Sequence, residues 1–427
     1  VESTFRSCYA GEEEHGSVRL PRSAGGKGRR EADEANKPAE VEAIEAFLLS
    51  QAEFRHNVIT HHCEIRWTEE AGFLPLTDRD VNTLWGRMNK TVGRVYLTDI
   101  YNVIHSEFVP LFNPFQSYFD HLPSWDGVSD PIGDLADTVH VKSDQAEFRD
   151  YFRKWFVGIL PALLDDTVVN HEILVLIGEQ GLYKTTWFNF LLPPELRCYF
   201  YTKTNSDRLN KDDLFSLTEF ALICFEELDG MRPAELNQLK AMVTMPYVNE
   251  RAAYGRNKER HPHIASFCGT GNNVQFLTDP TGNRRWLPFE VSQIRDPHQH
   301  AIPYELVYSQ AYALWKSGFC HWFSQEEIRV LNTHNSRFEV PNLEEDLIRT
   351  HFRKPFEGEA GIFVTAADIL EQISSCLRYP LSPNKIGRIM AGLEFESIRY
   401  KGKRGYITVK KTGEDIDRER RSGALGL

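Results

Sequence analysis

The residues best suited to chemistry lie in the stretch "ILVLIGEQGLYKTT", residues 173–186. An apolar run is followed by Gly178, by Gly181 and then by Lys184. In a phosphate-binding loop, successive backbone N–H groups and a helix N-terminus point at the phosphates, and a lysine reaches the terminal oxygens. Here Gly178 would make the turn and Lys184 would supply the cation. The stretch therefore predicts a binding site for a nucleoside triphosphate.

The two threonines after the lysine fit the same site. Thr185 has the hydroxyl that would bind Mg²⁺, and Thr186 continues the helix that would face the phosphates. Tyr183 departs from the motif, because a phosphate loop has its last glycine there. We expect Gly181 to supply the backbone freedom instead, and the Tyr183 ring to point away from the phosphates. The alternative is a capped core helix in which the glycines and Lys184 are incidental.

A pair of carboxylates follows the next clear strand. The apolar run 221–225 ends in Glu226 and Glu227, about forty residues after the loop. Beside a phosphate loop, one carboxylate (we assign it to Glu226) would lie near Mg²⁺, and the other would orient or deprotonate the attacking water. A surface glutamate pair after a buried strand is the alternative interpretation.

Two further segments complete the pattern. In "IASFCGTGNN" an apolar strand ends in small and amide residues, and Asn272 could hydrogen-bond a water molecule or the γ-phosphate. In "DPTGNRRWLPFE", Arg284 and Arg285 suit a finger that stabilises transition-state charge, in the same chain or from a neighbouring subunit. Taken singly, each segment is also typical of an ordinary or solvated turn. The order and spacing of all four segments favour a nucleotide-hydrolysing site.

Composition places limits on the class of protein. The chain has 427 residues, enough for two to four domains, with 41% hydrophobic and 26% charged residues, as in a globular protein. Seven scattered cysteines indicate a reducing, cytoplasmic environment. Apolar runs are well short of the ~20 residues that cross a bilayer, so no membrane partner is expected. The net charge of −12 argues against nonspecific nucleic-acid binding by the whole molecule but allows local basic patches. A first residue other than Met suggests a piece of a longer chain.

The patterning predicts five regions along the chain. Residues 1–37 have few large apolar residues and predict a disordered lead-in. Helical and alternating patterns over 38–150 predict a mostly helical α+β region. Strands alternate with helices over 151–325, which is typical of an α/β core with a largely parallel sheet. Two helices and a two-stranded ribbon are expected over 342–412, and a disordered tail over 413–427.

The quoted segments resemble the virulence-associated protein E family of phage and mobile-element proteins, over about residues 54 to 410. The resemblance is carried by "YFDHLPSWDG", "GEQGLYKTTW", "CFEELDG", "GTGNN", "TGNRRW" and "GKRGY". It implies a P-loop NTPase core of the AAA+ type, similar to superfamily 3 helicases, with ATP and Mg²⁺ as cofactors. By this resemblance, Lys184 and Thr185 would bind ATP–Mg²⁺, and the Walker B acidic pair would be Glu226 and Glu227. Asn272 would be the sensor. The finger would be Arg284 or Arg285.

Two basic runs predict contacts with DNA. The run 249–261 lies between the acidic strand and the sensor strand, and in a ring-shaped ATPase of this type it would project a basic hairpin into the pore. The run 399–411 has six basic residues and no acidic one, and with the preceding helix 382–393 it fits a winged-helix-like module. For either run alone, a solvated charged face is the alternative. The DNA-binding candidates are Arg256, Lys258, Arg260, Lys401, Lys403 and Arg404.

These expectations combine into an ATP-dependent DNA helicase or translocase that assembles as a homo-oligomeric ring, a hexamer. It would act on single-stranded or forked DNA in the replication of a phage or mobile element. The family often carries a primase-type domain upstream, which this chain does not show, so a primase is a further expected partner. One alternative is a nucleotide-binding, DNA-associated switch or scaffold without unwinding activity, which Tyr183 keeps open. Another is a structural interaction protein with a vestigial loop.

Overall fold

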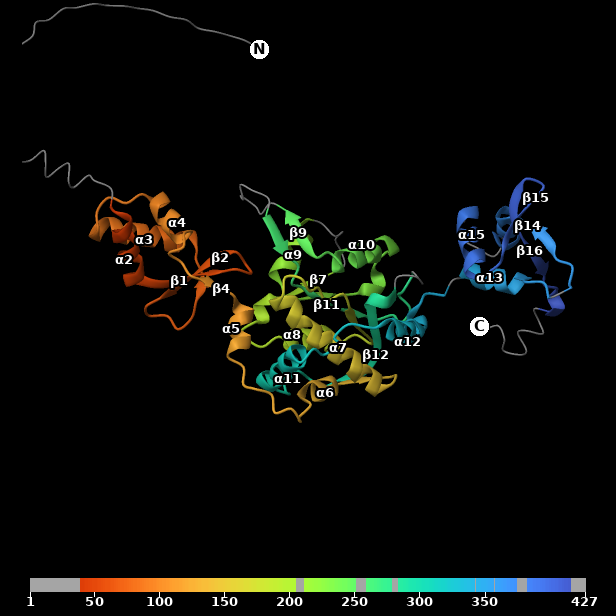
Figure 1. The fold of residues 1–427 in the computed structure, drawn as a ribbon, viewed down its shortest axis with the longest axis horizontal. Helices are drawn as coiled ribbons and strands as arrows, with labels where there is room; N and C mark the ends of the chain where they lie inside the picture. The colour runs from red at the N-terminus through yellow and green to blue at the C-terminus, as the bar shows by residue number, and fades with distance from the viewer. Residues whose placement is uncertain are drawn as a thin grey trace, which may run out of the picture. The chain divides into compact units, whose positions relative to one another are not determined.

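The structure is a computed structural model, which describes residues 39–204, 211–250, 259–278, 283–341, 343–356, 358–374 and 382–415 (Figure 1). The chain divides into two compact units, one ending at Tyr118 and the other beginning at Phe119. The boundary that the sequence predicted at residue 150 falls instead inside helix α7 (Gln145–Leu164). The predicted lead-in lies outside the described residues, as does most of the predicted tail.

The N-terminal unit packs three helices against a four-stranded sheet. Phe54 and Ile65 alternate with polar residues on the two central strands and are buried against Leu84 and Ile100 of the helices. Thr77 starts the longest of these helices with a capping box that it forms with Asp80. The strands run in the order β3-β2-β1-β4. The elements are α2 (Val41–Gln51), β1 (Ala52–Asn57), β2 (His62–Trp67), β3 (Leu74–Pro75), α3 (Asp78–Thr91), α4 (Leu97–Ile104) and β4 (Leu111–Phe112).

The second unit contains a six-stranded sheet in the order β5-β12-β6-β11-β8-β7. Five strands are parallel to one another, and β5 pairs antiparallel at one edge. The predicted alternation of strands and helices in an α/β unit is therefore confirmed. The strands are β5 (Val139–Val141), β6 (Ile173–Ile177), β7 (Phe200–Lys203), β8 (Leu222–Phe225), β11 (Ser266–Gly271) and β12 (Trp286–Ile294).

Helices cover both faces of this sheet (Figure 1). The side chains of Ile173, Val175 and Ile177 pack under α9 (Lys211–Glu219) and α10 (Pro233–Val243). The other face is covered by α7 and by α8 (Lys184–Leu191), and α11 (Tyr304–Lys316) packs on α7. Every residue of β6 is buried, which explains its continuous apolar run. Other elements of this unit are α6 (Pro131–Ala136), η1 (Arg197–Tyr199), α12 (Gln325–Asn335) and η4 (Ser336–Phe338). Helix α5 (Pro114–Asp120) spans the boundary between the two units.

The C-terminal part has its own core. Ile348, Ile369, Ile386 and Met390 come from three helices and pack with Tyr406 of the long strand β16. This strand pairs with each of the three other strands of this part. The elements are α13 (Leu343–His351), β13 (Phe352–Arg353), β14 (Ile362–Val364), α14 (Ala366–Ser374), α15 (Pro383–Gly392), β15 (Ser397–Tyr400) and β16 (Lys403–Lys410). Within the described ranges, none of the helices combines the length and apolar character that crossing a bilayer requires.

Candidate active site

The loop after β6 lies at the carboxyl end of a central strand, between β11 and β12. The chain leaves β6 toward β7 on one side of the sheet, and β12 is added on the other side. In open α/β sheets, ligands bind at such a point, outside the carboxyl ends of the strands. Gly178 donates its N–H to the carbonyl of Gly271 (3.1 Å), which ties the loop to β11. A Cβ on Gly178 would lie 2.9 Å from the carbonyl oxygen of Val291, so a larger residue does not fit there without a shift.

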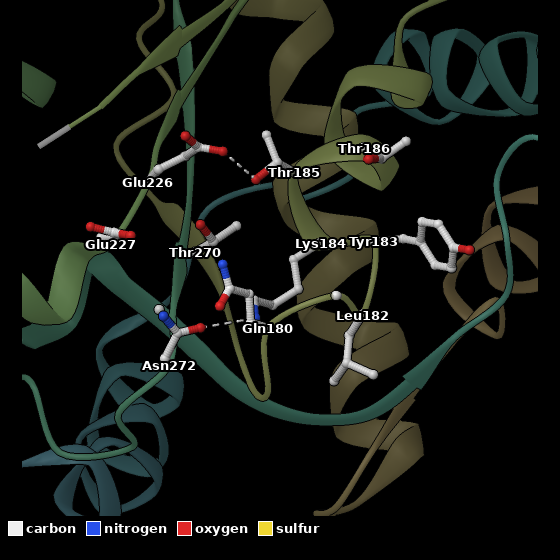
Figure 2. Close-up of a pocket in the computed structure, with 12 residues that line it drawn as sticks. Gln180, Leu182, Tyr183, Lys184, Thr185, Thr186, Glu226, Glu227, Thr270 and Asn272 are labelled. Atoms are coloured by element: carbon white, nitrogen blue, oxygen red, sulfur yellow. Dashed lines mark hydrogen bonds between the residues drawn. The ribbon is translucent and has the colours of Figure 1, made fainter.

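Tyr183 occupies the N-cap position of α8 in the left-handed conformation, with φ 61° and ψ 18°. Gly181 also has a positive φ, 89°. The sequence suggested that Gly181 alone would adopt a positive φ, but the loop has this conformation at both Gly181 and Tyr183. A tyrosine held in this region costs about 1–3 kcal/mol of strain that a glycine avoids. The Tyr183 ring points away from Glu226 and Asn272 (Figure 2).

Lys184 places its ammonium group at the centre of the loop. Its Nζ donates to the carbonyl oxygens of Gly178 (2.6 Å) and Glu179 (2.8 Å) and lies 3.4 Å from Oδ1 of Asn272. Burial lowers the pKa of Lys184, and the carboxylate of Asp229 opposes that shift. The ammonium is thus held by neutral oxygens, which are weaker partners for it than the charged oxygens of a phosphate.

Thr185 and Glu226 are joined by a hydrogen bond. The Thr185 hydroxyl donates to Oε1 of Glu226 at 2.8 Å (Figure 2). A hydroxyl and a carboxylate oxygen side by side are the hard ligands that Mg²⁺ prefers. Within the described residues, no group of three or more His, Cys, Asp or Glu side chains could hold a metal ion. The Thr185–Glu226 pair alone suits Mg²⁺, because this ion commonly takes one or two protein oxygens and completes its shell with phosphate and water.

The loop and the ends of β8 and β11 enclose a cavity of about 400 Å³, within the usual size range of ligand sites. Gly178 is not among the lining residues, but its carbonyl oxygen accepts a hydrogen bond from Lys184, which is. Of the residues that the sequence predicted, eight line the cavity: Gly181, Tyr183, Lys184, Thr185, Thr186, Glu226, Glu227 and Asn272. The lining residues that sequence reasoning missed are Gln180, Leu182, Thr270 and Gly271.

Asp229 is a supporting residue that sequence reasoning also missed. It lies in η2 (Leu228–Gly230), directly after the glutamate pair. Its Oδ1 accepts the N–H of Asn272 (3.1 Å), and its Oδ2 accepts the N–H of Asn273 (3.0 Å). The carboxylate therefore fixes the turn after β11 to the end of β8. Its position three residues after Glu226 in "FEELDG" was the available signal, but only strand pairing reveals what it contacts.

Replacing Asp229 with asparagine is expected to lower kcat of the ATP hydrolysis that the sequence predicts about tenfold or more, while leaving its KM nearly unchanged. An amide nitrogen cannot accept the second N–H bond, so Asn272 loses its fixed position, and small misplacements are costly to catalysis. The matched control is Asp165→Asn, because Asp165 also accepts a turn N–H, from Thr167 (2.9 Å), but does not line the cavity. Equal losses in both variants, or a pure KM effect, would contradict this role.

Arg284 and Arg285 do not lie near the cavity of their own chain. They belong to η3 (Asn283–Arg285), directly before β12, and Trp286 pairs with Ile173 at the start of β6. The arginines thus lie at the amino end of the parallel strands, whereas the loop lies at the carboxyl end. The two ends are separated by the length of β6, about 13 Å at ~3.3 Å per residue. The prediction of a finger acting within the same chain is therefore wrong. The alternative of a finger from a neighbouring subunit remains a prediction.

The two arginines differ in exposure. Arg284 is exposed, whereas Arg285 is partly buried. Burial and the charge of Arg284 lower the pKa of Arg285, and Glu172 opposes that shift. Arg284 is consequently the better placed of the two to reach another molecule.

The DNA-binding candidates are only partly described. Arg256 and Lys258 lie outside the described residues. Arg260 lies on β10 (Glu259–Pro262), which pairs antiparallel with β9 (Tyr247–Glu250), and its Cζ is 3.6 Å from the centroid of the Tyr247 ring. The arms of the predicted hairpin are therefore present.

The second basic run forms a tight hairpin. Lys401 and Gly402 make a two-residue turn, both with positive φ (47° and 80°), between β15 and β16. Lys403 and Arg404 follow on β16, and all three basic side chains are exposed. Turns of this kind match the twist of the flanking strands.

A family model described as the virulence-associated protein E-like domain matches residues 120–340, more than half of the chain. The protein belongs to this family.

Solved structures of the NrS-1 C-terminal region are also similar. An apo structure aligns with a TM-score of 0.45 at 11% identity, covering 87% of this chain and 99% of that chain. An A-form apo structure aligns with a TM-score of 0.43 at 12% identity, with the same coverage. No curated protein matches.

Proposed function

We propose that this protein is an ATP-dependent DNA helicase or translocase that acts in replication of a phage or mobile genetic element, with a P-loop core of the AAA+, superfamily 3 helicase-like type. The observation that carries the proposal is the convergence of Lys184, the Thr185–Glu226 pair and Asn272 on one cavity. They come from the loop after β6 and from the ends of β8 and β11. A cation, a hydroxyl–carboxylate pair and an amide around one cavity are the parts that phosphoryl transfer requires.

The chemistry follows from what each side chain can do. Loop N–H groups and the start of α8 would bind the β- and γ-phosphates, and Lys184 would exchange its carbonyl partners for phosphate oxygens. Bound Mg²⁺ would neutralise negative charge on the phosphates. Glu227 would orient the attacking water or accept its proton, and Asn272 would hydrogen-bond that water or the γ-phosphate.

A ring of subunits is supported by the position of the arginines. Arg284 is exposed at the amino ends of the parallel strands, whereas the cavity lies at their carboxyl ends. Two such different surfaces on one chain suit a head-to-tail interface. Such an interface generates a ring when its rotation closes and an open filament when it does not. The hexameric state, the primase partner and the cytoplasmic location stay predictions from the sequence.

Contacts with DNA are supported by the β9–β10 pair that carries Arg260 and by the C-terminal hairpin. Three helices and a hairpin with a basic turn are the parts of a winged-helix-like module. The hairpin would lie against the phosphate backbone, because exposed lysine and arginine side chains bind there without reading sequence.

The triple variant Lys401→Asn, Lys403→Gln and Arg404→Gln is expected to weaken DNA binding and to reduce its dependence on salt. The slope of log K against log salt is negative, and each lost phosphate contact reduces its magnitude by about 0.7 for single strands. Asparagine is chosen for Lys401 because it tolerates the left-handed conformation of the turn. Affinity for a single strand at several salt concentrations measures the effect. An unchanged slope would exclude the hairpin from the interface.

The experiment that tests the proposal is ATP turnover with and without single-stranded DNA. Turnover that DNA stimulates supports a motor. Tight nucleotide binding without turnover would favour the alternative switch or scaffold, for which the strained Tyr183 is the specific observation.

A further inference from the structure

Tyr183 has a conformation that its own type disfavours. Its φ of 61° is the value that glycine adopts without strain. Strained residues persist where the surrounding structure holds them, and they gather at functional sites. The residue is also 43% exposed, so packing in the core does not account for its conformation. Its hydroxyl has no hydrogen-bond partner among the residues that the structure describes.

Tyr183 is one of the residues that line the cavity, and the direction of its ring indicates its use. Tyr183 is the one aromatic residue among those that line the cavity, as far as the described residues show. Figure 2 shows its ring on the side opposite Glu226 and Asn272, with Lys184 between. The groups suited to phosphates and Mg²⁺ thus lie on one side of Lys184, and the aromatic ring lies on the other.

We propose that Tyr183 is the base-stacking residue of this site. This inference rests on the proposed function, because it takes the end near Lys184 and Glu226 as the triphosphate end. The nucleobase of a bound nucleoside triphosphate would then lie against the ring. Because every base has an aromatic face, stacking distinguishes a nucleotide from an inorganic triphosphate but discriminates little between bases.

The test compares two ligands in three proteins. A non-hydrolysable ATP analogue and inorganic tripolyphosphate, each with Mg²⁺, are titrated calorimetrically into the parent chain, Tyr183→Phe and Tyr183→Asn. Phenylalanine keeps the aromatic face, and asparagine removes it while tolerating a positive φ. We expect Tyr183→Asn to weaken the analogue about tenfold, as loss of one stacked base predicts, and to leave tripolyphosphate affinity within about twofold. Tyr183→Phe should resemble the parent for both ligands.

Three results would overturn the inference. Equal weakening of both ligands in Tyr183→Asn would mean that the residue acts through the loop backbone. Tighter binding of the analogue by Tyr183→Asn would mean that the ring obstructs the site. A parent chain that binds neither ligand would remove the proposed function together with the inference, whereas the first two results leave the proposed function intact.

Discussion

Replacing Lys184 with methionine is expected to reduce ATP hydrolysis at least a hundredfold. Methionine keeps most of the volume of this buried side chain, so the change removes mainly the charge. Loss of one preorganised donor to developing charge typically costs 10²–10³ in rate, about 3–4 kcal/mol. Phosphate release at saturating ATP measures the effect, and thermal unfolding checks that the variant is folded.

Lys316→Met is the matched control, because Lys316 is exposed at the end of α11 and does not line the cavity. It should hydrolyse ATP at the parent rate. If Lys184→Met kept the parent's nucleotide affinity and turnover, the loop would be vestigial, and the protein would be better described as a structural interaction protein.

Mixing two inactive variants is expected to restore hydrolysis. Lys184→Met lacks a working cavity but keeps Arg284, and Arg284→Ala keeps the cavity but lacks the finger. If the arginine of one subunit completes the cavity of the next, random mixing in a ring makes about a quarter of the interfaces whole, because the interface is head-to-tail. Turnover of the one-to-one mixture should therefore reach about a quarter of the parent rate, well above either variant alone.

The control for this experiment is a mixture of Lys184→Met with Glu226→Gln. Both changes damage the cavity of their own chain, so no combination of subunits makes an intact site, and activity should stay low. Solution mass of each mixture with the ATP analogue establishes that the rings form. Assembled Lys184→Met and Arg284→Ala mixtures that stay inactive would remove the finger role of Arg284. Recovery with Arg285→Ala in place of Arg284→Ala would assign the role to its neighbour.

Much of the candidate site could be predicted from the sequence, for a simple physical reason. Lys184, Glu226 and Asn272 each follow an apolar run that ends in polar residues. Buried parallel strands are continuous apolar runs, and their carboxyl ends meet at one edge of the sheet. Knowledge of the local pattern was therefore sufficient to expect these three side chains around one cavity, which they line.

The tertiary structure alone decided the rest. The sequence could not place Arg284, because a basic turn beside an apolar run has the same pattern at either end of the parallel strands. The pairing of Trp286 with Ile173 puts Arg284 at the amino ends of the strands, away from the cavity. Likewise, Asp229 acquires its role only when β8 and β11 lie side by side, which joins residues more than forty positions apart. Local pattern encodes burial and propensity, whereas strand order and register depend on contacts distant in the chain.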